Sequence, residues 1–286
     1  MQVRPDGFDA TWKWWLPPAH SSFGDDVDLL FYWIFWITMV TFVGVEGLML
    51  YFCFKYRRNP ARKAIYTKGS HSLEVAWTVI PAVILVALGV ASAKTWATTK
   101  NPADPSFPQE FQTTIKIVAE QFGWKVFYAG TDKEFGTADD FFETNILNVP
   151  YEPVRRNDAG EVVEVLTEEN VRILLGSKDV IHSLFIPVLR VKQDAVPGYL
   201  GNVWFDCQRA TDPGPDDKHL TSDAKYSEDG RTLVDWEESY EIACAELCGL
   251  GHSRMKMSLK AVPRVDWEAW IKAKSDDAKL RAAAGG

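Results

Sequence analysis

The sequence predicts a two-helix transmembrane hairpin followed by an all-β domain that ends in a helix. Three observations support this fold class: two long apolar runs in the first hundred residues, short strand-like segments separated by turns through most of the remainder, and helical spacing in residues 265–283. We expect an external N-terminal segment over residues 1–24, the hairpin over residues 25–100, and an external β domain with a C-terminal helix over residues 101–286.

The two apolar runs have the length and composition of membrane spans. Residues 29–54 contain a single charge in 26 positions, and residues 75–93 contain none in 19. A helix of about 20 apolar residues crosses a bilayer. Two core helices of a soluble protein are the alternative, but such helices usually keep a polar face. The runs therefore predict two transmembrane helices surrounded by lipid.

Charges predict the orientation of the hairpin. The linker at residues 55–72 carries six Lys or Arg side chains and no acid. The positive-inside rule leaves such a loop in the cytoplasm, so both termini and the β domain should lie on the periplasmic side of a bacterial inner membrane. The first hundred residues have a net charge of +3 and the remaining 186 a net charge of −11. This acidity argues against binding of nucleic acid and favours a basic partner.

The external part reads as a linker followed by many short strands. Residues 101–109, NPADPSFPQ, contain three prolines and predict a connection to the membrane. Turn residues such as those at 158–160, Asp-Ala-Gly, separate the strand-like runs, a pattern typical of a β-sandwich or barrel. The predicted strands are TTIKIVAE, WKVFYAG, EVVEVLT, NVRILLGS, VIHSLFIPV, GNVWFDC, YEIACAE and KMSLKAV.

Two further segments complete the external part. Residues 207–240 are acidic and rich in Gly and Pro, so we expect a solvated surface loop, which near a redox site could attract a basic protein. In the last segment, Trp267, Trp270 and Ile271 share a helical face that should pack on the β domain.

Residues 244–255, CAELCGLGHSRM, gather four soft donors: Cys244, Cys248, His252 and Met255. Their spacing also fits one face of a helix, but the glycines between them favour a loop. A disulfide is compatible with an external location, and zinc is a competing metal that usually takes Cys and His ligands. Thiolate, imidazole and thioether together favour copper, and the second thiolate suggests two copper ions bridged by two sulfurs.

We expect His182, in the run SKDVIHSLFIP, to supply a second imidazole. The other histidines lie in the N-terminal tail (His20), across the membrane (His71), in the acidic loop (His219) and in the cluster itself. A lone histidine on an apolar strand is more often a core residue than a ligand. The donor cluster later in the chain reverses that expectation here, because a cupredoxin-like sandwich or barrel brings a histidine of an early strand beside its last loop. We therefore expect the external domain to be all-β and cupredoxin-like.

These motifs resemble subunit II of the haem-copper cytochrome c oxidases. The family's CuA pattern, Cys-x-Glu-x-Cys-x3-His-x2-Met, begins here at Cys244, and DVIHSLFIP, RVKQDAVPG and SLEVAWTVIP also match. The resemblance extends from WLPPAHSS near the N-terminus to the C-terminal helix. It implies a dinuclear copper centre, CuA, whose ligands are His182, Cys244, Cys248, His252, Met255 and the backbone carbonyl of Glu246.

The resemblance also implies partners and roles. Electrons would come from a c-type cytochrome, soluble or attached, and pass to haem on subunit I, where oxygen is reduced to water and protons are pumped. The carboxylate of Glu246 would reach a Mg²⁺ ion shared with subunit I, because hard oxygen ligands suit this cation. Glu74, in SLEVAWTVIP, would mark the mouth of a proton-uptake channel. Glu46, inside the first apolar run, should face protein or water, because a carboxylate is unfavourable in lipid.

One position departs from the family pattern. Many members carry Gln-Trp-x-Trp in the first strand of the domain and accept electrons at the first Trp, whereas Phe122 stands in that place here. Either Trp124 takes over this role or it is a core residue.

Two other interpretations of the whole chain are a CuA-containing subunit of a nitric oxide reductase and the copper-less subunit II of a quinol oxidase. The motif around Glu74 favours the oxidase over the first, and the complete set of CuA ligands argues against the second.

Overall fold

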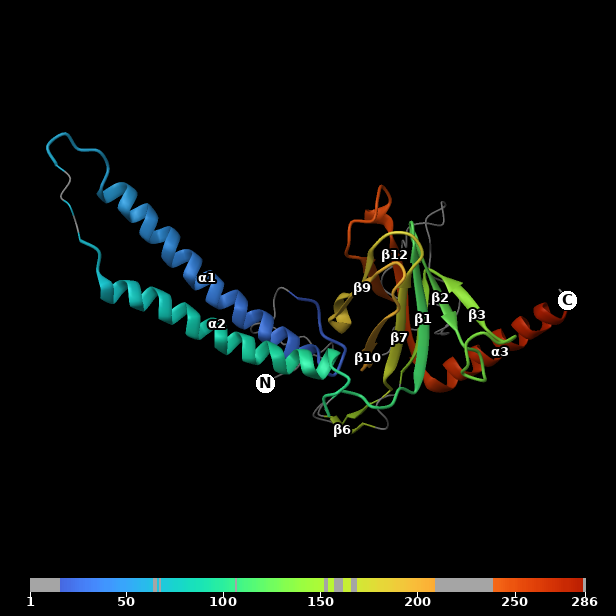
Figure 1. Cartoon of the computed structure of the whole chain (residues 1–286). Coiled ribbons are helices and arrows are strands. Elements are labelled where there is room, and N and C mark those ends of the chain that lie inside the picture. Colours follow the sequence, from blue (N-terminus) through green and yellow to red (C-terminus); the bar gives the residue numbers. More distant parts are fainter. Residues whose placement is uncertain are drawn as a thin grey trace.

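The computed structural model describes residues 16–284, except residues 64, 65, 67, 106, 152–153, 157–161, 166–168 and 209–238. A helical hairpin extends from a β domain, and a C-terminal helix lies on the side of that domain away from the hairpin (Figure 1). The predicted fold class is confirmed. Most of the predicted acidic loop, residues 209–238, and the first 15 residues lie outside the described part of the chain.

The hairpin consists of α1 (Gly24–Lys55) and α2 (His71–Lys100). Both helices are long and apolar enough to cross a membrane, and none of the residues in their most apolar windows is buried. Large side chains such as Trp33, Phe54 and Val86 are exposed over most of their surface. The hydrocarbon core of a bilayer can cover such a surface, because apolar side chains are favourable in lipid and the backbone polar groups are already bonded within each helix.

The β domain contains two five-stranded sheets and a small two-stranded one. The first sheet has the order β10-β7-β1-β2-β3 and the second β4-β12-β11-β8-β9. Neighbouring strands are antiparallel except the pairs β1–β7 and β4–β12, which are parallel. The strands are β1 (Thr113–Glu120), β2 (Gly123–Tyr128), β3 (Phe141–Thr144), β4 (Ile146–Tyr151), β5 (Val154–Arg156), β6 (Val162–Val165), β7 (Val171–Ser177), β8 (His182–Ile186), β9 (Val191–Ala195), β10 (Gly201–Phe205), β11 (Tyr240–Cys244) and β12 (Lys256–Pro263).

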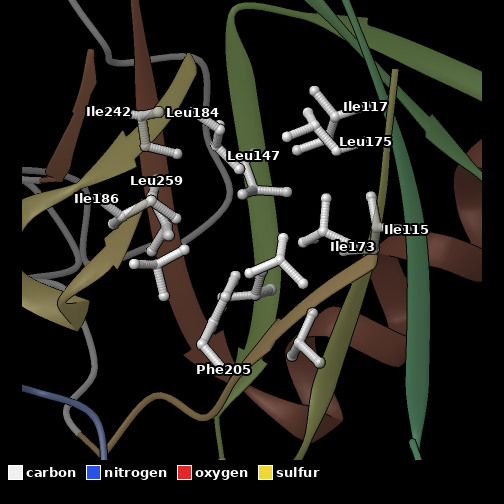
Figure 2. Packing of buried hydrophobic residues seen from close by; sticks show 14 of the residues in the cluster. Ile115, Ile117, Leu147, Ile173, Leu175, Leu184, Ile186, Phe205, Ile242 and Leu259 are labelled. Atoms are coloured by element: carbon white, nitrogen blue, oxygen red, sulfur yellow. The ribbon is translucent and has the colours of Figure 1, made fainter. Parts of the chain in front are cut away.

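The core lies between the two large sheets. Strand β1 alternates buried and partly exposed residues along its whole length, as expected of a strand with one face in a core. Figure 2 shows large side chains from the two sheets pointing toward one another, all fully buried: Ile115, Ile117, Ile173, Leu175 and Phe205 from the first sheet, and Leu147, Leu184, Ile186, Ile242 and Leu259 from the second.

The helix α3 (Arg264–Ala284) packs on this sandwich, as the sequence predicts. Ile271 is buried, and the ring of Trp270 meets that of Tyr128 edge-on with 5.0 Å between centroids. At the start of the helix, Arg264 forms an ion pair with the buried carboxylate of Glu169. These contacts place α3 over the sheets at the end of the chain.

The strands β3, β4, β5 and β9 are not predicted from the sequence. Residues of β4 are buried on both faces, so the strand lacks the alternation of apolar and polar residues that identifies a half-buried strand. Pro150 within β4 also argues against a strand, but β4 lies at the edge of its sheet, where proline is tolerated. Strand β9, VKQDA, is another edge strand and is mostly polar.

Residues 16–23, called the strap below, hold the N-terminal side of the hairpin against the β domain. The backbone N–H of His20 donates to the carbonyl of Val188 at 2.7 Å. The hydroxyl of Ser21 donates to the carbonyl of Leu189 at 2.8 Å. The strap therefore runs along the segment that joins β8 to β9.

A buried ion pair strengthens this joint. Asp28, near the start of α1, is 1% exposed, and its two carboxylate oxygens accept hydrogen bonds from Arg190 at 2.5 and 3.0 Å. Arg190 comes directly before β9. At the end of α2, the ammonium group of Lys100 donates to the side chain of Gln193 in β9 at 2.9 Å. Both helices are thus tied to the same edge of the β domain.

Candidate metal centre

Two neighbouring strands bring the predicted donors together. His182 begins β8 and Cys244 ends β11, and these strands pair antiparallel with Cys244 opposite Leu184. Paired strands lie about 4.8 Å apart. The backbone N–H of Ala245 continues the pairing by donating to the carbonyl of Ser183 at 3.0 Å. The imidazole therefore lies beside the chain as it leaves β11.

Residues 245–255, called the ligand loop below, connect β11 to β12. The backbone N–H of Cys244 donates to the carbonyl of Met255 at 3.0 Å and closes the loop. Inside it, the N–H of His252 donates to the carbonyl of Gly249 at 3.1 Å and begins a 3-10 turn. Gly249 has a φ of +133°, a conformation that only glycine adopts without strain. The glycines thus produce a loop and not a helix.

The thiols and imidazoles form a continuous cluster. The sulfurs of Cys244 and Cys248 lie 3.8 Å apart. His182 Nδ1 lies 3.9 Å from the sulfur of Cys244, and His252 Nδ1 lies 3.6 Å from the sulfur of Cys248. Each imidazole therefore approaches a different thiol, and the thiols stand between the two rings.

Two further donors adjoin the same sulfurs. The thioether sulfur of Met255 lies 3.7 Å from the sulfur of Cys248, and the backbone carbonyl oxygen of Glu246 lies 3.2 Å from the sulfur of Cys244. His182 and Met255 are 0% and 1% exposed. The structure thus brings all six ligand atoms implied by the resemblance within 4 Å of one of the two thiols.

The two cysteines are free thiols and not a disulfide. Their separation of 3.8 Å is far longer than the sulfur–sulfur bond of about 2.05 Å. Burial, together with the neighbouring Cys244, raises the pKa of Cys248 to about 11. Two thiolates are therefore unfavourable at this place unless a cation neutralises them, which is the condition that a metal ion satisfies.

The donor chemistry fits copper better than zinc. A structural zinc site uses four Cys or His ligands in a closed tetrahedron. Here a thioether and a carbonyl oxygen supplement two thiols and two imidazoles. Thioether ligands suit copper, whereas zinc sites are built from Cys, His and carboxylate ligands. Six donors also exceed what one tetrahedral ion requires. The residues present therefore fit a dinuclear copper centre.

A carboxylate orients one of the imidazoles. His182 Nε2 lies 2.8 Å from Asp179 Oδ1, so the other ring nitrogen, Nδ1, is directed toward the thiols. Partial burial opposes ionisation of Asp179, but hydrogen bonds from His182, Gln121 and Val180 outweigh it and hold the pKa of this carboxyl below its usual range. A charged acceptor behind a histidine is a common support for a metal ligand.

The predicted acidic residues lie at the surface. Glu246 is exposed on the ligand loop, and its backbone carbonyl adjoins the sulfur of Cys244. Glu74 occupies the first turn of α2 with its side chain 55% exposed. Glu46, on α1, is partly buried. The structure therefore brings Glu246 to the metal centre and leaves the other two in the hairpin.

The two aromatic candidates for electron acceptance differ in exposure. Trp124 is 0% exposed and lies within the core, with its ring centroid 6.3 Å from that of His182. Phe122 is 41% exposed, and its ring packs against Gly249 and Gly251 of the ligand loop. Of the two, only Phe122 is accessible from the surface. Trp124 has the position of a core residue.

Sequence reasoning missed two residues of the site, Asp179 and Gln121. Asp179 stands three residues before His182 in DVIH, and a carboxylate so near a candidate ligand is a signal that could have been used. Gln121 directly precedes Phe122 and contacts the carbonyl of Cys248, which is 127 residues away in the chain. No local pattern reveals a contact of that separation.

Comparison with known proteins identifies the family. The sequence family of the cytochrome c oxidase subunit II transmembrane domain matches residues 9–95, and the family of the cytochrome c oxidase subunit II periplasmic domain matches residues 113–212. A probable cytochrome c oxidase subunit 2 of Rickettsia bellii is 27% identical over 269 residues, which cover 92% of this chain and 85% of the relative. Cytochrome c oxidase subunit 2 of Branchiostoma floridae is 30% identical over 201 residues, covering 70% of this chain and 71% of the relative.

A solved structure is also similar: the periplasmic domain of subunit II of cytochrome oxidase from Bradyrhizobium japonicum, with a TM-score of 0.39 and 18% identity, covering 59% of this chain and 96% of that one. The two family matches and the two apolar helices describe an integral membrane protein with a periplasmic domain. The chain belongs to the cytochrome c oxidase subunit II family.

Proposed function

We propose that this chain accepts electrons from a reduced c-type cytochrome at a dinuclear copper centre and passes them to haem in subunit I, where oxygen is reduced to water. The observation that carries the proposal is the gathering of two thiols, two imidazoles, a thioether and a carbonyl within 4 Å of one or other sulfur. Three of these donors, Cys244, Cys248 and Met255, belong to the buried core, and His182 beside them is 0% exposed, so these four donors are shielded from water.

The roles of the ligands follow from their positions. Cys244 and Cys248 would hold the copper pair as thiolate ligands, His182 and His252 as imidazole ligands, and Met255 with the Glu246 carbonyl would complete the set. When bound, the copper pair supplies a site that takes up and releases one electron. The protein holds four of the donor residues, His182, Cys244, Cys248 and Met255, in buried positions, so these ligands need move little when the charge changes.

The exposed parts of the site suit its partners. Phe122, which covers the ligand loop and is 41% exposed, would be the contact for the cytochrome donor. The carboxylate of Glu246 would bind Mg²⁺ together with residues of subunit I, because a hard oxygen ligand suits that cation. Glu74, at the cytoplasmic end of α2, would receive protons for a channel in subunit I. The membrane would be the inner membrane of a bacterium, with both termini in the periplasm.

Copper loading of the purified full chain tests the central proposal. Wild type should bind two copper ions and give an electron paramagnetic resonance spectrum of one electron shared between them. Cys248→Ser should abolish this spectrum, because the second bridging sulfur is lost. Cys53→Ser, which removes an exposed thiol of α1, is the matched control and should leave it intact. A wild-type spectrum in Cys248→Ser would contradict the assignment.

The carboxylate roles are tested in the assembled oxidase. Glu246→Gln should keep the copper spectrum, because the backbone carbonyl remains, but should weaken binding of Mn²⁺ used as a probe for Mg²⁺. Glu241→Gln, on β11, is the control. Glu74→Gln should slow oxygen consumption without altering the copper spectrum. Undiminished Mn²⁺ binding in Glu246→Gln, or normal turnover in Glu74→Gln, would remove the respective role.

A further inference from the structure

The turn between β1 and β2, residues 121–122, lies between the two segments that carry the copper donors. The side-chain amide of Gln121 donates to the carbonyl of Cys248 at 2.5 Å, on the ligand-loop side. The backbone N–H of the same residue donates to Asp179 Oδ2 at 2.7 Å, on the His182 side. One residue of the first sheet thus contacts both parts of a site whose donors belong to the second sheet and its loop.

These bonds form an unbroken path between two ligands. Asp179 uses Oδ2 for Gln121 and Oδ1 for His182, so the path runs from Cys248 through Gln121 and Asp179 to the imidazole. The segment carrying Asp179 is itself fixed to the first sheet, because the backbone N–H of Lys178 donates to the carbonyl of Ala119 at 2.9 Å. The path is therefore anchored at its centre.

Phe122 presses on the same loop. A Cβ atom at Gly249 would lie 3.1 Å from the far edge of the Phe122 ring and 2.9 Å from the amide nitrogen of Gln121. A Cβ atom at Gly251 would lie 2.4 Å from Cγ of Phe122. The turn and the ligand loop are therefore packed so closely that only glycine leaves room, and the ring lies over the loop that carries Cys248 and His252.

We infer that Gln121 is a positioning residue for the copper centre, which holds the ligand loop and the His182 segment at a fixed separation. The inference rests on the proposed function and concerns a residue that would not itself bind metal. The amide group is essential, because its N–H donates to a carbonyl acceptor. A carboxylate of the same shape has no proton to donate at neutral pH and would bring a negative charge against the Cys248 carbonyl and near Asp179.

Gln121→Glu tests the inference, with Gln121→Ala as the second variant and Lys125→Gln, on β2, as the control. Because Gln121 is exposed, its variants should fold, and the melting temperature of the copper-free chain should fall by no more than about 6 °C, the effect of losing one hydrogen bond. Loss of a residue that supports a metal ligand commonly weakens metal binding by about 10-fold to 100-fold. We expect at least about 10-fold weaker copper retention against a chelator in Gln121→Glu, and a smaller loss in Gln121→Ala.

The spectrum and the reduction potential of bound copper separate positioning from general stability. Both Gln121 variants should change the copper hyperfine splitting and the potential, whereas Lys125→Gln should change neither. Wild-type retention, splitting and potential in both Gln121 variants would overturn the inference while leaving the proposed function intact. If either Gln121 variant fails to fold without copper, the residue supports the fold and the inference is overturned. If wild type itself shows no shared-electron spectrum, the proposed function fails first.

Discussion

The contact between Gly251 and Phe122 predicts that Gly251→Ala destabilises the chain when Phe122 is present and stabilises it when the Phe122 ring is removed. In Gly251→Ala, the new Cβ atom would lie 2.4, 2.5 and 2.9 Å from three ring carbons of Phe122. Carbon atoms in contact normally stay about 3.5–4.0 Å apart, so the ring or the loop must move by roughly 1 Å. The nearest atom is Cγ, at the base of the ring, so the whole side chain has to shift and not only its tip.

Two opposing terms set the magnitude. Overpacking of this kind costs about 1–3 kcal/mol. The backbone of Gly251, with φ of −90° and ψ of 5°, is acceptable for alanine. Replacing glycine by alanine at such a position stabilises a protein by about 0.4–1 kcal/mol, because the unfolded chain loses freedom. We therefore expect a net loss of about 0.5–2 kcal/mol beside Phe122, and a net gain of about 0.4–1 kcal/mol once Phe122→Ala has removed the ring.

Thermal unfolding of the copper-free full chain in detergent measures both values. For a domain of this size, 1 kcal/mol corresponds to about 2–4 °C in melting temperature. Gly251→Ala should melt about 1–8 °C below wild type, whereas Phe122→Ala/Gly251→Ala should melt no lower than Phe122→Ala. Equal shifts in the two backgrounds would refute the reasoning, because they would mean that Phe122 does not restrict the loop.

Three further outcomes are expected. Asp28→Asn should destabilise the chain by about 3–5 kcal/mol in thermal unfolding, because it leaves the buried Arg190 guanidinium without its charge partner; a melting temperature unchanged from wild type would show that the pair is dispensable. Burial opposes ionisation of Asp139, but hydrogen bonds from Thr137 and Thr131 and the contact with Lys279 outweigh it and hold the pKa of this carboxyl well below its usual range. Its contribution to stability is therefore complete above about pH 4 and is lost as pH falls below that value, so Asp139→Asn should lower the melting temperature at pH 7 and flatten its decline in acid; equal acid sensitivity in the two proteins would count against this. If the acidic domain recruits a soluble basic cytochrome, turnover of the oxidase should fall as ionic strength rises above about 0.1 M, and a flat response would indicate an attached donor.

The elements that the sequence predicts are those whose signal is local. The apolar runs at residues 29–54 and 75–93 mark α1 and α2, although both helices extend further at each end. Polar residues such as Asp28 extend α1 beyond its apolar run, because a partner on the β domain satisfies them. The strand β1 is recognisable from its alternation, whereas β4 is not, because both of its faces are covered.

The candidate site divides in the same way. Cys244, Cys248 and His252 lie in one short loop, so their association is visible in the sequence, and His182 is found because few other histidines are available. Asp179 has a local signal, its place three residues before His182, but the bonds of Gln121 to Cys248 and Asp179 depend on contacts between the two sheets. Such contacts follow from the register and twist of the whole domain, which residue patterns do not specify. Metal-binding residue types can therefore be recognised in the sequence, whereas the contacts that position them cannot.

The strap and its neighbouring contacts bear on how the domain can move. Residues 101–109 alone would serve as a hinge, on which a soluble domain could swing about the end of α2. The strap, the Asp28–Arg190 pair and the Lys100–Gln193 bond add anchorages at β9, an edge strand of the second sheet, and at the segment just before it, so the domain cannot pivot without breaking them. The β domain that carries the candidate metal donors is consequently joined to the hairpin by these contacts as well as by the linker, which restricts how far the donors can move relative to α1 and α2.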